Sequence, residues 1–140
     1  MAALDRPVLA ERAATVERHL TRVGARLPRN PAELVAASDA SDAVILHLWQ
    51  AVQIVIDLGL SACLHFNLGT PESYGDAFHR LADAGFLETD LAQRLTQAAG
   101  FRNLVAHAYE GLDMARVHRA AVEGPADLRA FLARLRDLLT

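Results

Sequence analysis

The sequence predicts an all-α protein, an up-and-down bundle of about four to five helices joined by short connections. Three observations support this. The chain has 140 residues, the size of one domain, so residues 1–140 are expected to share one hydrophobic core. Apolar residues make up 52% of the chain, too many for a disordered protein. Alanine and leucine dominate while glycine (8) and proline (5) are sparse, which favours helices and excludes a β-sandwich.

The first helix is expected to begin after Asp5 and to end before Pro28. Asp5 can accept a hydrogen bond as N-cap, and Pro7 suits a first turn because the N–H that it lacks would have no partner there. Apolar residues then recur at steps of four and three, as one helix face requires. They are Leu9, Ala13, Val16, Leu20, Val23 and Leu27.

A second helical region is expected to begin at the cap-like segment Asn30-Pro31-Ala32-Glu33 and to reach about Phe66, with a break near residues 38–41 left open. Its apolar stretch is crossed by one narrow polar strip, which argues against a membrane span and for a buried core helix. The strip consists of His47, Gln50, Gln53, Asp57, Ser61 and His65. Two interpretations stay open: a solvent-facing edge, or a polar strip that faces a cleft.

Three further helical segments complete the bundle. A short helix is expected over residues 73–84, closed by Gly85, and a longer one from residue 88 or 89 to about Tyr109. The last is expected from Asp113 to Leu139, with a kink or break at Gly124-Pro125.

Charge and cysteine content exclude several kinds of protein. Fourteen basic residues, all arginine, against 17 acidic ones give a net charge of −3, which argues against a polybasic nucleic-acid coat protein. Without lysine, Schiff-base chemistry is not available. The single cysteine, Cys63, excludes an internal disulfide and is expected in the core. The charged N-terminal segment, residues 1–11, has no signal-peptide core, so a cytoplasmic protein is expected.

The remaining histidines suggest no metal site. His19 and His118 stand among charged residues and are expected to be solvated. Asp76 and His79 have the i, i+3 spacing of carboxylate-bridged metal bundles, but no Glu-x-x-His pair accompanies them. Neither a metal ion nor a cofactor is therefore expected.

The segment from Gly100 to Tyr109 places four chemically active side chains within eight positions. At about 100° per residue, Asn103 and His107 share one side of a helix, while Arg102 and Tyr109 share another. These groups span a wedge that is too broad for a compact active site. Two copies facing each other across a twofold axis could form one.

A purely structural interpretation of these four residues stays open. Arg102 would then pair with an acid, either Glu110 or Asp113. Asn103 would start a helix, His107 would be a hydrogen-bonded core histidine, and Tyr109 would pack.

The pattern Arg-x4-His-x-Tyr, formed by Arg102, His107 and Tyr109 with Gly-Phe before it and Gly111 and Asp113 after it, resembles the HEPN superfamily. Within that superfamily it resembles the HepT-like toxins of toxin–antitoxin pairs. The resemblance extends from about residue 43 to 139. Three strip residues, Gln53, Asp57 and His65, stand at positions similar to polar positions of the family, whereas Ser61 and Leu64 depart from it.

The resemblance implies a homodimeric, metal-independent endoribonuclease that cleaves RNA by attack of the ribose 2′-OH. Arg102 and His107 would be catalytic, with Asn103 assisting, and Gln53, Asp57 and His65 would support the cleft. The partner implied is a minimal nucleotidyltransferase antitoxin (MntA-like), which would add AMP to the tyrosine at position 109. No DNA or membrane partner is implied.

Two other functions stay open. The first is a non-catalytic HEPN module that binds RNA or a nucleotidyltransferase, which the net acidic charge slightly favours. The second is a helical bundle that binds a metal ion or a small ligand.

Overall fold

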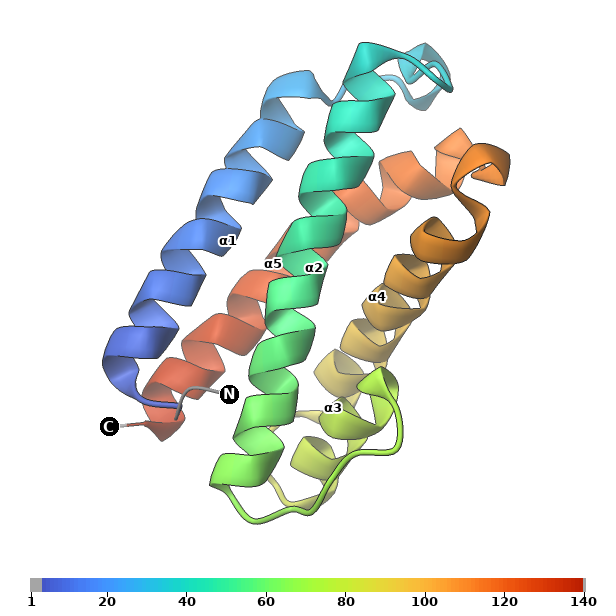
Figure 1. Ribbon diagram of the computed structural model, residues 1–140. Coiled ribbons are helices and arrows are strands. Elements are labelled where there is room, and N and C mark those ends of the chain that lie inside the picture. The colour runs from blue at the N-terminus through green and yellow to red at the C-terminus, as the bar shows by residue number, and fades with distance from the viewer. Residues whose placement is uncertain (1–3, 140) are drawn as a thin grey trace.

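The computed structural model describes residues 4–139 and shows an all-α bundle, as the sequence predicts. Its α-helices are α1 (Arg6–Arg26), α2 (Asp39–His65), α3 (Tyr74–Asp83), α4 (Thr89–Ala108) and α5 (Met114–Leu138). Two short 3₁₀ turns, η1 (Pro31–Glu33) and η2 (Tyr109–Gly111), precede α2 and α5. Figure 1 shows α2 along the middle of the bundle, with α1 on one side, α4 on the other and α5 behind.

Side-chain caps set the helix starts. The Asp5 carboxylate accepts the Val8 N–H at 2.9 Å, as predicted. Asn30 does cap, but the helix that it opens is only the three-residue η1, so the second helical region does not begin as an α-helix at this cap. The break left open near residues 38–41 is real, because Ser38 and Ser41 form a reciprocal capping box that starts α2.

The core is built around α2. By length and mean hydropathy this helix could cross a membrane, but it packs against α1, α3, α4 and α5. The cysteine at position 63 is fully buried in it, as predicted, and its Sγ lies 3.3 Å from the Ala77 carbonyl oxygen of α3.

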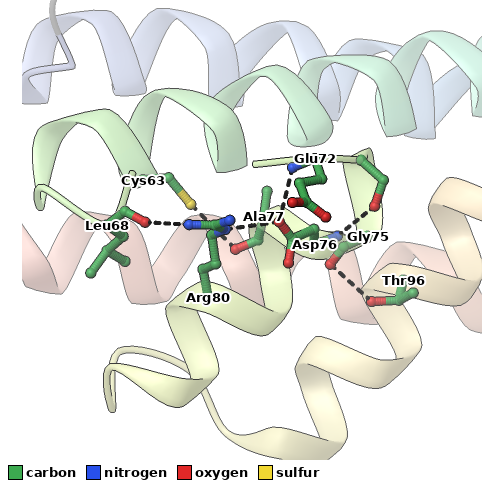
Figure 2. A network of polar contacts seen from close by, with 9 residues as sticks. Cys63, Leu68, Glu72, Gly75, Asp76, Ala77, Arg80 and Thr96 are labelled. Carbon is green, nitrogen blue, oxygen red and sulfur yellow. Dashed lines mark hydrogen bonds and ion pairs between the residues drawn. The ribbon is translucent and has the colours of Figure 1, made fainter. Parts of the chain in front are cut away.

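The connection from α2 to α3 is fixed by one arginine (Figure 2). Arg80 donates to the Leu68 carbonyl and to the Asp76 carboxylate, each at 2.8 Å. Because Arg80 neutralises Asp76, the i, i+3 pair with His79 is not a free ligand pair. Among the described residues, no group of three or more His, Cys, Asp or Glu side chains could hold a metal ion.

Helix α5 runs without a break through Pro125, so of the kink or break expected at Gly124-Pro125 the break does not occur. Proline removes only one N–H donor, and the buried residues Ala121 and Leu128 hold the turns on either side against the core.

Two histidines expected to be solvated are not. His118 is buried, and its Nε2 lies 2.7 Å from the Pro28 carbonyl oxygen. His19 is half-buried, with its Nδ1 3.0 Å from that of His47 on α2. In both cases a neighbouring segment, distant in sequence, covers the ring.

Candidate functional site

Arg102 on α4 is held on several sides by α2, α3 and its own helix. Its Nε donates to Gln53 Oε1 at 2.7 Å, and its Nη1 donates to Asn103 Oδ1 at 3.2 Å. The guanidinium carbon lies 5.1 Å from the Trp49 ring centroid and 5.3 Å from that of Tyr74, within the range of cation–π attraction. The structural interpretation of Arg102 as the ion-pair partner of a nearby acid is therefore wrong. Its hydrogen-bond partners are neutral, and it forms no ion pair among the described residues.

A chain of polar contacts extends from Arg102 across α2 to α1. Gln53, which accepts from Arg102, donates its own Nε2 to Asp57 Oδ1 at 3.0 Å. Asp57 in turn lies 3.8 Å from the Arg12 guanidinium. Gln53 and Asp57 are half-buried and face partners on two other helices. This part of the α2 strip is therefore not a plain solvent-facing edge.

Asn103 and His107 lie one turn apart near the end of α4, and both are exposed on the protomer. Neither alternative interpretation of the two fits: Asn103 lies inside the helix rather than at its start, and His107 is not a core residue. Their side chains are thus open to a ligand or to a second chain, as the predicted site requires.

Tyr109 follows α4 directly, in η2. Its hydroxyl donates to Asp42 Oδ1 at 2.6 Å, which joins the end of α4 to the first turns of α2. The hydrogen bond to Asp42, together with partial burial and the nearby negative charge, raises the pKa of Tyr109 to about 12. The phenol is therefore fully protonated at neutral pH, while 44% of the residue remains exposed.

His65 stands apart from this group. It ends α2 two turns beyond Asp57, and its ring contacts that of Phe66 edge-on at 4.9 Å. The structure thus brings Gln53 and Asp57 to Arg102 but leaves His65 elsewhere.

Sequence reasoning missed four residues around the motif: Arg12, Asp42, Trp49 and Tyr74. Trp49 could have been found, since it lies one turn before Gln53 on the same side of α2. Arg12, Asp42 and Tyr74 belong to segments far from the motif in sequence, and their spacing carries no signal.

The protein is an all-α bundle with an Arg-x4-His motif in the last turns of α4. These two features define the HEPN class of proteins. A family model described as ribonuclease HepT-like matches residues 16–135. The chain therefore belongs to the HepT-like ribonuclease family, as the sequence motif indicates.

Individual relatives agree with this assignment. The mRNA nuclease HepT of Shewanella oneidensis is 32% identical over 73 residues, which cover 52% of this chain and 55% of that protein. The match thus spans about half the length of that relative.

Solved structures show that the whole fold is shared. A tri-AMPylated Shewanella oneidensis HEPN toxin in complex with MNT antitoxin aligns with a TM-score of 0.84 at 23% identity, covering 94% of this chain and 98% of that one. The cytosolic protein YutE of Bacillus subtilis, of unknown function, aligns with a TM-score of 0.81 at 18% identity, covering 99% and 93%.

Proposed function

We propose that this protein is an endoribonuclease toxin that cleaves RNA without a metal ion. The observation that carries the proposal is the arrangement on the second half of α4, where Arg102, held by neutral partners, bonds to the exposed Asn103, and the exposed His107 follows one turn after Asn103. Family membership supports the same activity. The bundle is expected to act in the cytoplasm, on RNA.

The reaction proposed is transfer of a phosphodiester within the RNA chain. The ribose 2′-oxygen attacks the adjacent phosphorus, its proton passes to a base, and the bond to the 5′-oxygen breaks as that oxygen takes a proton from an acid. Histidine has the pKa range for both proton transfers at neutral pH. An arginine without an ionic partner can bond to the equatorial phosphate oxygens, whose negative charge grows in the transition state.

A homodimer would supply the base and the acid together. One protomer carries a single His107, exposed on its surface, whereas the reaction needs two proton-transfer groups at one phosphate. A twofold axis near the end of α4 would bring two copies of His107 and Asn103 together. We assign one His107 as the base and the other as the acid.

We further propose that Tyr109 is the site at which a nucleotidyltransferase antitoxin inactivates the protein. In that step the Tyr109 oxygen bonds to the α-phosphorus of ATP, pyrophosphate leaves and the phenolic proton is released. The exposure of Tyr109, two residues from His107, supports this assignment. A bulky anion there would repel the RNA phosphates.

RNA cleavage in the presence of EDTA tests the proposal. Cleavage by the parent protein is expected to persist, whereas Arg102→Ala and His107→Ala should each lose at least ~100-fold, the scale expected when one proton-transfer or charge-stabilising group is removed. His79→Ala, which alters an exposed histidine on α3, is the matched control and should cleave normally. If His107→Ala cleaves as well as the parent, the catalytic assignment is wrong.

The same assay distinguishes the proposed nuclease from the non-catalytic alternative. A module that only binds RNA or a nucleotidyltransferase would form complexes with these partners but give no cleavage products. Loss of activity in EDTA would instead indicate a metal-dependent protein.

A further inference from the structure

The second half of α1 carries an unusual concentration of positive charge for a protein with a net charge of −3. Arg18, Arg22 and Arg26 follow one another at steps of one turn and share one helix face. No acidic residue occurs from Arg18 to Ala32. Within residues 4–139, Arg22 and Arg26 take part in no ion pair, unlike Arg12 on the same helix, which pairs with the α2 carboxylate.

A hollow lies between this basic face and the start of α2. It has a volume of about 300 Å³, and its lining is Arg22, Ala25, Arg26, Ala43 and His47. Two of the lining residues are alanines, whose short side chains leave room for the guanidinium groups and the imidazole to contact a ligand. No acidic side chain lines it. The hollow therefore offers hydrogen-bond donors and positive charge, which suits an anion.

A pair of histidines adjoins the hollow. The Nδ1 atoms of His19 and His47 lie 3.0 Å apart, so the two rings share one hydrogen bond. Burial lowers the pKa of both, with the Arg22 charge contributing to each and the His47 and Arg18 charges contributing at His19. Ion-paired Glu17, bound to Arg129, is the nearest acid in sequence on α1. The residues that line the hollow thus contribute arginine charge and an imidazole, and none of them is acidic.

The hollow lies at the same end of the bundle as the proposed cleavage site. Ala43 in its wall follows Asp42, the residue that accepts the hydrogen bond from Tyr109. In Figure 1 the end of α1, the start of α2 and the end of α4 lie at this end. The first turn of α2 carries Asp39 and Asp42, so a bound RNA strand would draw its positive contacts from the hollow on one side of α2 and from α4 on the other.

We propose that Arg22, Arg26 and His47 form a binding site for a phosphodiester of the RNA substrate, outside the cleavage site. The RNA assignment rests on the proposed function, whereas the preference for a phosphodiester rests on the hollow itself. Arginine binds phosphate oxygens in a bidentate manner, and binding to single strands depends on such basic grooves. The site would supply affinity for a polyanion that the net charge of the molecule does not.

Binding of a short fluorescent single-stranded RNA, measured by anisotropy, tests the site. The His107→Ala protein serves as background so that the RNA stays intact. Adding Arg22→Gln and Arg26→Gln should weaken binding at least ~10-fold and reduce the slope of log K against log salt by about 0.7, the value for one lost phosphate contact on a single strand. Circular dichroism would verify that the variant keeps its helices.

The matched control is Arg6→Gln with Arg134→Gln. These arginines lie at the start of α1 and near the end of α5, at the other end of the bundle (Figure 1), are exposed and form no ion pair among the described residues, so the double variant loses the same net charge. It should bind RNA within about twofold of the background protein, since a distant charge is largely screened at physiological salt. Equal losses in the two double variants, or none in the first, would overturn the proposed site.

Two further measurements separate this inference from the proposed function. By NMR, RNA binding should raise the pKa of His47, because a phosphate nearby favours the protonated ring; an unchanged value would contradict the contact. If the parent protein binds RNA in this way but never cleaves it, the nuclease proposal fails and the binding site stands. If it cleaves RNA while the Arg22/Arg26 variant binds RNA normally, the binding-site proposal fails and the nuclease proposal stands.

Discussion

At the scale of single residues, Arg102 is fixed before any substrate arrives. Gln53 accepts a hydrogen bond from one of its N–H groups and Asn103 accepts from another. The rings of Trp49 and Tyr74 lie within cation–π distance of the guanidinium. A long side chain that is held in place loses little further entropy when it binds a phosphate. In the proposed reaction Gln53 would accordingly be a positioning residue, since it accepts a hydrogen bond from Arg102 and donates one to Asp57.

Gln53→Ala should therefore slow RNA cleavage about 10-fold, because a displaced guanidinium fits the transition state poorly. The loss is expected mainly in kcat, with KM changed less. Gln50→Ala, an equally half-buried glutamine one turn earlier on α2, is the matched control and should behave like the parent. Equal rates for the two variants would show that Arg102 needs no support from Gln53.

Tyr109 gives a second prediction at this scale. The chain has two tyrosines, and the hydrogen bond to Asp42 raises the pKa of Tyr109 to about 12. Its folded-state pKa exceeds the usual value near 10, so this contact stabilises the fold fully below pH 10 and ceases to do so as the pH rises toward 12. Ultraviolet titration should show a late tyrosinate transition that Tyr109→Phe removes and Asp42→Ala moves toward pH 10.

At the scale of helices, the contact between His19 and His47 makes the packing of α1 on α2 sensitive to acid. The fold lowers the pKa of both from 6.5, first by burial. As the pH falls below 6.5 the unfolded chain binds protons more readily than the folded one, so stability falls. Above that pH the contribution is fully present.

Urea unfolding at pH 7.5 and pH 5.5 would measure this effect. The parent protein should lose stability between the two, and His47→Gln should lose less, because one of the two perturbed groups is gone. His65→Gln, at the exposed end of α2, should keep the full pH dependence of the parent. A pH dependence unchanged in His47→Gln would exclude the pair as its source.

The helices themselves could largely be predicted from the sequence, because their signals are local. Asp5, Ser73 and Gly85 mark boundaries that the structure confirms. The short η1 was missed because Pro31 and Glu33 mimic the start of a longer helix, while Ser38 and Ser41 provide the real one. Of the kink or break expected at Pro125, the break does not occur, because the turns around it are buried against the core, which local propensity does not encode.

The candidate site was predictable only in part. Arg102, Asn103 and His107 lie on α4 and Tyr109 follows it directly, so the sequence alone shows that all four belong to one end of one segment. Their partners on other helices depend on how α2 and α3 pack against α4, which periodicity does not encode. Hence Asp42, whose bond to Tyr109 spans 67 positions of sequence, carried no signal.

At the scale of the whole molecule, the proposed reaction requires two copies of the chain. One protomer presents one exposed His107, and the site would be completed across a twofold axis. Cleavage per protomer should therefore fall on dilution, at the concentrations where sedimentation velocity shows the dimer dissociating. Constant activity per protomer in a monomeric sample would exclude a shared site.

The bond between Tyr109 and Asp42 has a consequence for the inactivated protein. An esterified phenol has no hydrogen left to donate, and its phosphate would be pressed against the Asp42 carboxylate. If Tyr109 is modified as proposed, the attached AMP would then push η2 away from α2 as well as obstruct the surface near His107. The modification would thus change the backbone at the contact between η2 and α2. Amide hydrogen exchange at the start of α2 would then report the modification state with no RNA present.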